Sequence, residues 1–413
     1  MIHNFSAKNF YSIDEKIDVN LVAKEKGITR TELYADSALG KKVTKLAFIG
    51  GANGSGKSNI MRVLAFTKYL VGSGEDTDDD IPFVQFVPNF RKKPQIPTEI
   101  SVDFSIDNSR IYTLKFSLIP ERILEEELTV SEFISERSSS RRIYLRKWNK
   151  ESSAYKLILS DEASILKSIS ELPRILSTGK NQRKTVICLF SDIDSVESIL
   201  RKIKEFWQNV QTNIVAFGSV EAEGSASTLA GAALKEMVEK TSCSNLCDEM
   251  MKKIDIGFSK IEEAKTEDDD HQKFYVIRHK FGGYSFRLAP FQESTGTNRI
   301  SYLISRISKA LSVENGVAIV DDFDAFVHPD VYEKLISYFT SLEKNIKGTQ
   351  LIFSSHNYTT LNLLDKQQII LVERNEMGAT ETFRLDEVNG VRADDNFYAK
   401  YMAGVYGGTP RIS

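Results

Sequence analysis

The sequence contains little of several residue types, and each shortage excludes a class of protein. Only three cysteines occur in 413 residues, which excludes a framework of disulfides. The five histidines are scattered along the chain, and we expect no zinc site. The formal net charge of -3 excludes a protein that coats nucleic acid with its whole surface. Any contact with nucleic acid must be local or belong to a partner.

Long apolar runs are absent as well. None approaches the roughly 18 residues of a membrane-spanning helix, and the first residues, MIHNFSAKNFYS, lack a charged and then apolar leader. We therefore expect a soluble, cytoplasmic protein that makes no use of a membrane. Cys243 and Cys247 are close in sequence, but no second pair of ligands accompanies them, so two small helical residues are favoured over a metal pair.

The two ends of the chain show the same alternation of strands and helices. An apolar strand at 46–49 leads through a glycine-rich turn to apolar residues at helical spacing, from Ile60 to Phe66. Residues 281–413 contain further β-branched runs, which suit strands covered on both faces. We predict an α/β fold in which residues 1–120 and 281–413 form two halves of one nucleotide-binding sheet.

The middle of the chain, residues 121–280, differs in composition and is predicted to be an inserted, largely helical α+β domain. Its pattern predicts a hairpin at 141–160, an amphipathic helix at 195–211 and a second helical block at about 229–263. The Phe206 and Trp207 side chains of the amphipathic helix are assigned to the core. No sustained heptad repeat occurs, which argues against a long coiled coil.

The segment GANGSGKS, residues 51–58, fits the full phosphate-loop pattern between a predicted strand and a predicted helix. Its glycines allow backbone N–H groups to surround phosphates, and the start of the helix adds a favourable dipole. We expect Lys57 to pair with the β- and γ-phosphates of ATP and Ser58 to bind Mg²⁺. The residues predicted to bind ATP here are Gly51, Asn53, Gly54, Ser55, Gly56, Lys57, Ser58 and Asn59.

The stretch VAIVDDFDAFVHPD, residues 317–330, supplies the predicted acidic residues. Asp321 ends a buried strand, where a carboxylate can hold Mg²⁺ through water. Asp322 is the predicted general base, in the position where most ATPases with this arrangement of strand and carboxylate have glutamate. Asp324 is the alternative base, and a surface role stays open for either residue. Because the shorter side chain withdraws the carboxylate by roughly 1.5 Å, we predict good ATP binding and slow hydrolysis.

Two further segments suit an ATP site. His356 follows a buried strand in LIFSSHN and is predicted to sense the γ-phosphate, with a structural histidine as the alternative. Ser294 and Gly296, in ESTGTNRISYL, precede a predicted helix and offer a hydroxyl and backbone N–H groups to an anion. Such a helix start is often only a cap, but its place shortly before the Asp321 strand favours an anion site.

The order of motifs along the chain resembles that of an ABC-type ATPase head domain of the SMC, Rad50 and RecF kind. The motifs are, in this order, the phosphate loop, the long insertion, ESTGT, VAIVDD, FVHP and SSHN. More narrowly, NFYSI, EEEL and NFYAKYMAGVYGGTP are similar to the short bacterial AAA15/AAA21 ATPases of anti-phage operons, of the AbiLi, RloA and PARIS types. The resemblance covers both outer thirds well and the insertion loosely.

The resemblance also implies roles for residues. Ser294 and Gly296 match the signature motif that contacts the γ-phosphate of the opposite subunit, and His356 matches the switch histidine. Gln95, in preference to Gln85, is expected to link the γ-phosphate and Mg²⁺. The sequence departs from the family at Asp322 and at Thr295, where an acidic residue is common; the first departure puts fast hydrolysis in doubt.

By this resemblance we expect an ATP-dependent sensor or scaffold in phage defence that controls a separately encoded effector, in the first instance a nuclease, since the chain carries no nuclease motif. One phosphate loop and one signature per chain imply a homodimer, or an assembly of dimers, with two ATP molecules at the interface. The insertion is expected to bind the effector, and a phage protein is the expected trigger.

Two alternatives remain. The chain could be a RecF- or Rad50-like ATPase of DNA repair, in which case the basic residues 137–150 would contact nucleic acid, although a solvated hairpin face is favoured. It could also be a nucleotide-gated scaffold that does not turn ATP over. The genes that lie beside it would discriminate defence from repair.

Overall fold

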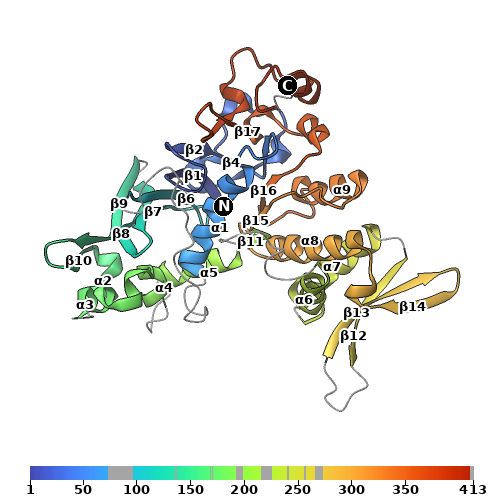
Figure 1. The fold of residues 1–413 in the computed structure, drawn as a ribbon, viewed down its shortest axis with the longest axis horizontal. Coiled ribbons are helices and arrows are strands. Elements are labelled where there is room, and N and C mark those ends of the chain that lie inside the picture. Colours follow the sequence, from blue (N-terminus) through green and yellow to red (C-terminus); the bar gives the residue numbers. More distant parts are fainter. Residues whose placement is uncertain are drawn as a thin grey trace.

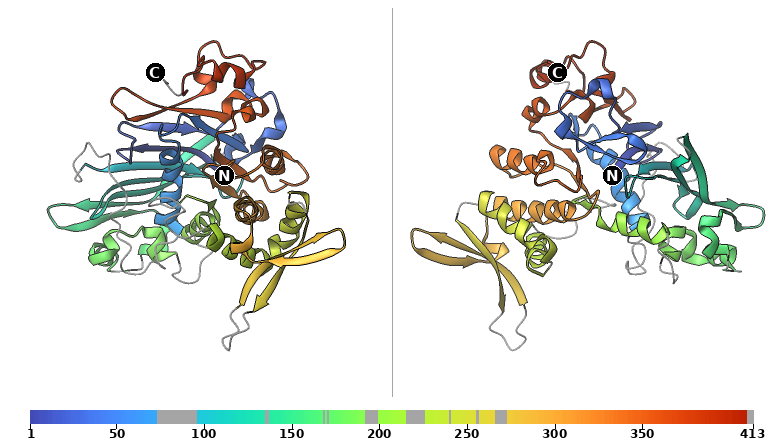
Figure 2. Two further views of the ribbon diagram at one scale, coloured as in Figure 1. Left: turned by 45° about the vertical axis from the view of Figure 1, so that its right-hand side comes forward. Right: turned by 180° about the vertical axis from the view of Figure 1, so that it is seen from behind.

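The computed structural model describes residues 1–72, 96–134, 137–167, 169, 171–191, 199–214, 226–239, 241–254, 257–265 and 273–409. Two sheets and the helices between and around them make up the larger part of the molecule (Figure 1). A smaller three-stranded sheet extends from one end, as two further views confirm (Figure 2).

The first sheet unites the two ends of the chain, as predicted. Its strand order is β11 (Gln211–Thr212), β15 (Val317–Val320), β16 (Gln350–Ser354), β5 (Leu46–Gly51), β17 (Ile369–Arg374) and β18 (Thr380–Arg384). All neighbours run parallel except β17 and β18. Because neighbouring parallel strands end at the same edge, β5, β15 and β16 deliver their following loops to one place. The α/β fold class is confirmed.

The second sheet is antiparallel and crosses the predicted boundary at residue 120. Its order is β10 (Ala154–Leu159), β9 (Arg137–Asn149), β8 (Arg122–Ile134), β7 (Ile111–Ile119), β6 (Thr98–Phe104), β1 (Ile2–Lys8) and β2 (Ile17–Asn20). The boundary falls between β7 and β8, where Ile119 pairs with Arg122. Three strands of the expected insertion therefore continue the sheet that the amino-terminal residues begin.

Alternate residues of β5 enter two different cores. Ala47 and Ile49 pack with helix α1 (Lys57–Gly72), which lies between the two sheets, whereas Leu46 and Phe48 face the opposite core. That second core includes residues of α8 (Thr295–Ser312) and α9 (Pro329–Thr340). Phe48 is fully buried, so Phe48→Ala should cost about 3–5 kcal/mol of folding free energy.

The rest of the middle region mixes helices and strands. The helices are α2 (Ser164–Lys167), α3 (Leu172–Ser177), α4 (Val186–Phe190), α5 (Ile199–Asn209), α6 (Ala226–Glu239) and α7 (Thr241–Ile254). The small sheet consists of β12 (Phe258–Lys265), β13 (Lys273–Phe281) and β14 (Tyr284–Leu288). The short pair β3 (Tyr34–Asp36) and β4 (Lys42–Thr44) and helix α10 (Phe397–Met402) complete the elements used below.

One prediction about this region was wrong and another is confirmed. The expected helical block at 229–263 ends with α7, and its last residues belong to β12, which pairs antiparallel with β13. Neighbouring-strand pairing overrides the local helical pattern there. Trp207 is fully buried and lies 5.4 Å from Phe104, ring centroid to ring centroid, so the aromatic residues of α5 belong to the core.

The basic strand β9 faces an acidic neighbour. Register between β8 and β9 brings positive and negative side chains opposite or diagonal to one another. The ion pairs are Lys147 with Glu125, Arg146 with Glu126, Arg142 with Glu127 and Arg141 with Glu132. Much of the positive charge in 137–150 is thereby neutralised within the sheet. In the part of the chain that the structure describes, no helix is both long and apolar enough to cross a membrane.

Candidate functional site

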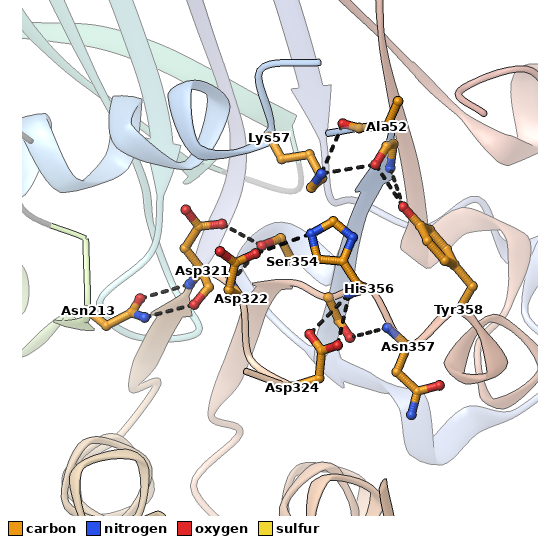
Figure 3. Close-up of polar contacts among 12 residues, drawn as sticks. Ala52, Lys57, Asn213, Asp321, Asp322, Asp324, Ser354, His356, Asn357 and Tyr358 are labelled. Atoms are coloured by element: carbon orange, nitrogen blue, oxygen red, sulfur yellow. Dashed lines mark hydrogen bonds and ion pairs between the residues drawn. The ribbon is translucent and has the colours of Figure 1, made fainter. Parts of the chain in front are cut away.

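Charged and polar side chains converge where β5, β15 and β16 end (Figure 3). Lys57 begins α1 directly after the loop that follows β5, and Asp321 and Asp322 follow β15. His356 follows β16, the strand that lies between β15 and β5 in the sheet. The sequence predicted each of these residues separately, and the strand order brings them together.

The phosphate-loop glycines have backbone conformations or surroundings that exclude other residues. Gly51, Gly54 and Gly56 have φ angles of +154°, +73° and +112°. A Cβ atom on Gly51 would lie 2.2 Å from the carbonyl oxygen of Val372, and one on Gly56 would lie 2.1 Å from Thr380 Oγ1. The loop therefore needs glycine both for its turn and for its close fit against β17 and β18.

Lys57 is directed into this loop. Its Nζ donates to the carbonyl oxygens of Gly51, at 2.9 Å, and Ala52, at 3.1 Å. Burial lowers the pKa of Lys57, and the nearby carboxylates, Asp322 foremost, act in the opposite direction. A buried cation that faces a ring of carbonyl groups and acids is suited to exchange those contacts for phosphate oxygens.

Other predicted members of the loop differ in their surroundings. Ser55 Oγ is buried and has no hydrogen-bond partner among the described residues, which fits a site that receives a further polar group. Asn53 and Gly54 are exposed, and Ser58 is half-buried in the first turn of α1. Asn59 instead donates from Nδ2 to Ser12 Oγ at 2.7 Å, a contact that ties α1 to the amino-terminal segment.

Asp321 is held by partners on two sides. Its backbone N–H donates to Asn213 Oδ1 and its carbonyl accepts from Asn213 Nδ2, both at 2.8 Å. Ser354 Oγ donates to Asp321 Oδ1 at 2.5 Å. The Asp321 carboxylate and the Ser58 hydroxyl are oxygen donors of the kind that Mg²⁺ prefers. Sequence patterns gave no signal for Asn213, because it follows a strand of two residues.

Asp322 adopts a backbone conformation that favours short polar side chains. Its φ angle is +48°, in the left-handed region where aspartate and asparagine are enriched and longer residues are less common. Burial raises the pKa of the Asp322 carboxyl, and so does the adjacent Asp321, whereas His356 and Lys57 lower it. His356 Nε2 lies 3.7 Å from Asp322 Oδ1.

Asp324, the alternative to Asp322 as general base, makes different contacts. Both of its oxygens accept from the backbone N–H of His356, at 3.0 Å and 3.2 Å. Asp324 thus anchors the loop that carries the histidine, while Asp322 faces the imidazole ring. Asp322 is the better candidate for a base.

A tyrosine that the sequence patterns missed completes the cluster. Tyr358 Oη donates to the Gly51 carbonyl at 2.7 Å and accepts from the Gly51 N–H at 3.2 Å. Its ring stacks on that of Tyr401 with centroids 4.4 Å apart. The only available signal was its place two residues after His356. Tyr401, which belongs to α10, therefore supports the phosphate loop through Tyr358.

The predicted signature residues start α8 and do not join the Lys57 cluster of their own chain. Ser294 is the N-cap, and its Oγ accepts from Thr297 N at 3.0 Å. A Cβ on Gly296 would lie 3.2 Å from the carbonyl oxygen of Phe326, whose side chain is 73% exposed. Ser294 is also exposed. Gln95 and Gln85, the candidates for the link to Mg²⁺, lie outside the described residues.

Solved structures that resemble the chain include head domains of SMC proteins. They include the SMC head domain from Thermotoga maritima, at 14% identity and a TM-score of 0.38, with 93% of this chain and 98% of that chain covered. The Smc head domain with a coiled coil and joint from Pyrococcus yayanosii has 13% identity and a TM-score of 0.46, with 97% and 99% covered.

A third structure of this kind is an Smc head domain with an extended coiled coil from Pyrococcus furiosus, bound to the C-terminal domain of ScpA. Its identity is 14% and its TM-score 0.44, with 94% of this chain and 97% of that chain covered. No curated protein matches the chain. The family model described as "AAA domain, putative AbiEii toxin, Type IV TA system" matches residues 46–362, a span that includes Lys57, Asp321, Asp322 and His356. Since this match extends over more than half of the sequence, the chain belongs to that AAA-domain family.

Proposed function

We propose that the protein is an ABC-type ATPase that binds ATP with Mg²⁺ at the Lys57 cluster, hydrolyses it slowly and uses its ATP state to control a separate effector in phage defence. The observation that carries this proposal is the convergence of Lys57, Asp321, Asp322 and His356 at three adjacent strand ends. Ligands of open α/β sheets bind outside such strand ends.

Each residue has a role that its surroundings support. Lys57 and the loop N–H groups would hold the phosphates, and Ser58 and Asp321 would hold Mg²⁺, which neutralises phosphate charge when bound. Asp322 would accept a proton from the attacking water, because its raised pKa makes it a stronger base than an exposed aspartate. His356, fixed through its backbone by Asp324, would orient towards the γ-phosphate.

A complete site requires a second copy of the chain. Ser294 is exposed and contacts Thr297 rather than the phosphate loop, which suits a hydroxyl that reaches ATP on another protomer. We therefore propose a head-to-tail homodimer with two shared ATP sites, alone or within a larger assembly. The assignment of Gln95 as the link between the γ-phosphate and Mg²⁺ remains part of this proposal, whereas the expected domain limits at residues 120 and 280 fall inside sheets, between β7 and β8 and within β13.

The defence role rests on the family to which the chain belongs, whose description names a putative AbiEii toxin. The proposed partners are an operon-encoded effector, in the first instance a nuclease, and a phage trigger. The repair alternative depended on the basic residues 137–150 as a nucleic-acid contact. Glutamates of β8 neutralise much of that strand, which weakens its support for the repair alternative.

Two measurements test this proposal. ATP binding and turnover should both be lost in Lys57→Ala and retained in Lys334→Ala, which removes an exposed lysine of α9. The product of the neighbouring gene should co-purify with the full-length protein and associate differently with Lys57→Ala.

Effector binding by the insertion cannot be tested by removing the whole insertion, because β8 to β10 share a sheet with β1. Tyr284→Ser is a milder test of effector binding, because it changes only the surface of the projecting strand β14, where Tyr284 is 80% exposed. ATP binding by Lys57→Ala equal to that of the wild type would refute the site. A neighbour product that never associates would refute effector control and return the repair hypothesis.

A further inference from the structure

A cationic cavity lies apart from the Lys57 cluster, among α1, α5, β11, α6 and α8. Its volume is about 380 Å³. The charged residues that line it are Lys68 of α1, Glu236 of α6, and Arg306 and Lys309 of α8. Three cations thus surround the cavity with a single carboxylate among its described lining residues. Such an excess of positive charge on half-buried side chains is unfavourable unless an anion is close.

The cations are partly, but not fully, compensated. Lys68 Nζ donates to the carbonyl oxygens of Gln208, at 2.8 Å, and Val210, at 2.5 Å, while Lys309 pairs with Glu236. Burial in the first place, together with the positive charges of Arg306 and Lys309, lowers the pKa of Lys68 to about 8. The carbonyl groups satisfy the hydrogen-bond donors of Lys68 without removing the repulsion between the three cations.

Arg306 has the greatest unused capacity. Its Nε is buried and has no hydrogen-bond partner among the described residues. Its NH1 makes one long contact, 3.5 Å to Gln211 Oε1, and its guanidinium lies 5.1 Å from the centroid of the Tyr302 ring. A planar guanidinium with free donors beside two ammonium groups matches the geometry and charge of a phosphate group.

We propose that this cavity binds the phosphate group of a small phosphorylated molecule, held by Arg306 with Lys68 and Lys309. The net charge of its lining, formally +2 from three cations and one carboxylate, matches a phosphate dianion. A cavity of this volume is larger than inorganic phosphate needs and lies within the range that holds small-molecule ligands.

The position of the cavity gives the ligand a route to the ATP site. Lys68 lies three turns along the helix that Lys57 begins, and Arg306 lies three turns along the helix that Ser294 caps. A ligand that joins the two helices would fix the orientation of the phosphate loop relative to the signature segment. This regulatory part of the inference rests on the proposed function, whereas the binding itself does not.

The test uses inorganic phosphate as the probe and calorimetry or ³¹P line broadening as the measurement. All proteins carry Lys57→Ala, so that the phosphate loop does not contribute. We expect phosphate to bind this background and a Lys334→Gln variant equally, and at least tenfold more weakly when Arg306→Gln or Lys68→Met is added.

Thermal unfolding provides a second readout, because the Tm of Arg306→Gln relative to that of its parent should depend on whether phosphate is present. In phosphate-free buffer of matched ionic strength, Arg306→Gln should be at least as stable as its parent, because it removes repulsion. Phosphate should raise the Tm of the parent and leave that of Arg306→Gln unchanged. No phosphate binding to the parent, or undiminished binding to the variants, would overturn the proposal without affecting the ATP site.

Discussion

His356 Nε2 and Asp322 Oδ1 face each other across 3.7 Å, with both side chains about half-exposed. The separation is longer than a hydrogen bond, but the two groups are close enough for a charged imidazole to lower the pKa of the Asp322 carboxyl. Asp322 reaches this position from a left-handed backbone conformation, which a glutamate would adopt less readily. The conformation gives a structural reason for aspartate at the position where the resemblance leads us to expect glutamate.

The length of this side chain should limit catalysis. If the shorter carboxylate is misplaced by about 1 Å, the loss in rate is on the order of 100-fold, and Asp322→Glu should recover part of it. Asp322→Asn keeps the length but removes the base and should abolish turnover while ATP still binds. Steady-state phosphate release measures all three proteins. A rate in Asp322→Glu equal to or below that of the wild type would contradict the idea that length is limiting.

Tyr358→Phe should loosen the phosphate loop. The change removes both hydrogen bonds to Gly51 and retains the ring that stacks on Tyr401. A loss of about 1 kcal/mol corresponds to an ATP affinity roughly 5-fold lower. Tyr398→Phe, on the same helix as Tyr401, is the matched control, and equilibrium binding of a fluorescent ATP analogue is the measurement. Equal affinities in both variants would show that the hydroxyl does not organise the loop.

Ser294→Arg should weaken ATP-dependent dimerisation, because it places a bulky side chain at the exposed start of α8. It also removes a helix cap worth about 1 kcal/mol, since Ser294 Oγ accepts from Thr297 N. Ser294→Ala loses the same cap without the added bulk and should dimerise more strongly than the arginine variant. Light scattering with and without ATP separates the two effects. Normal dimers and normal turnover in Ser294→Arg would refute the signature assignment.

His3 should make stability depend on pH. It is buried, with Nε2 2.9 Å from Ser105 Oγ and 3.0 Å from Ser37 Oγ, and burial lowers its pKa to about 3. Between this value and the ordinary pKa of about 6.5, only the unfolded chain takes up a proton, so stability falls as the pH decreases. From pH 7.5 to pH 5 the loss is about 2 kcal/mol.

Denaturant unfolding at the two pH values tests this dependence. His3→Gln should show a smaller loss of stability between pH 7.5 and pH 5 than the wild type. His328→Asn, which replaces an exposed histidine and can keep the cap of α9, should behave as the wild type does. An unchanged slope in His3→Gln would mean that other groups carry the pH dependence.

The sequence by itself determined the local features of this protein. The pattern of residues 46–58 predicted strand, loop and helix, and the apolar run before Asp321 predicted a buried strand, because both depend on periodicity and spacing over a few residues. The parallel sheet shared by the two ends also followed, since both ends contain continuous β-branched strands.

Only the tertiary structure decided which distant residues meet. The pairing of β8 with β9 neutralises the basic strand, the packing of α10 brings Tyr401 to Tyr358, and the approach of α1 to α8 joins Lys68 with Arg306. These contacts depend on strand register and on how helices pack against the sheets, which no local pattern encodes. The left-handed conformation of Asp322 belongs here too, because the hydrogen bond of its N–H to Ser354, on the neighbouring strand, helps to hold it.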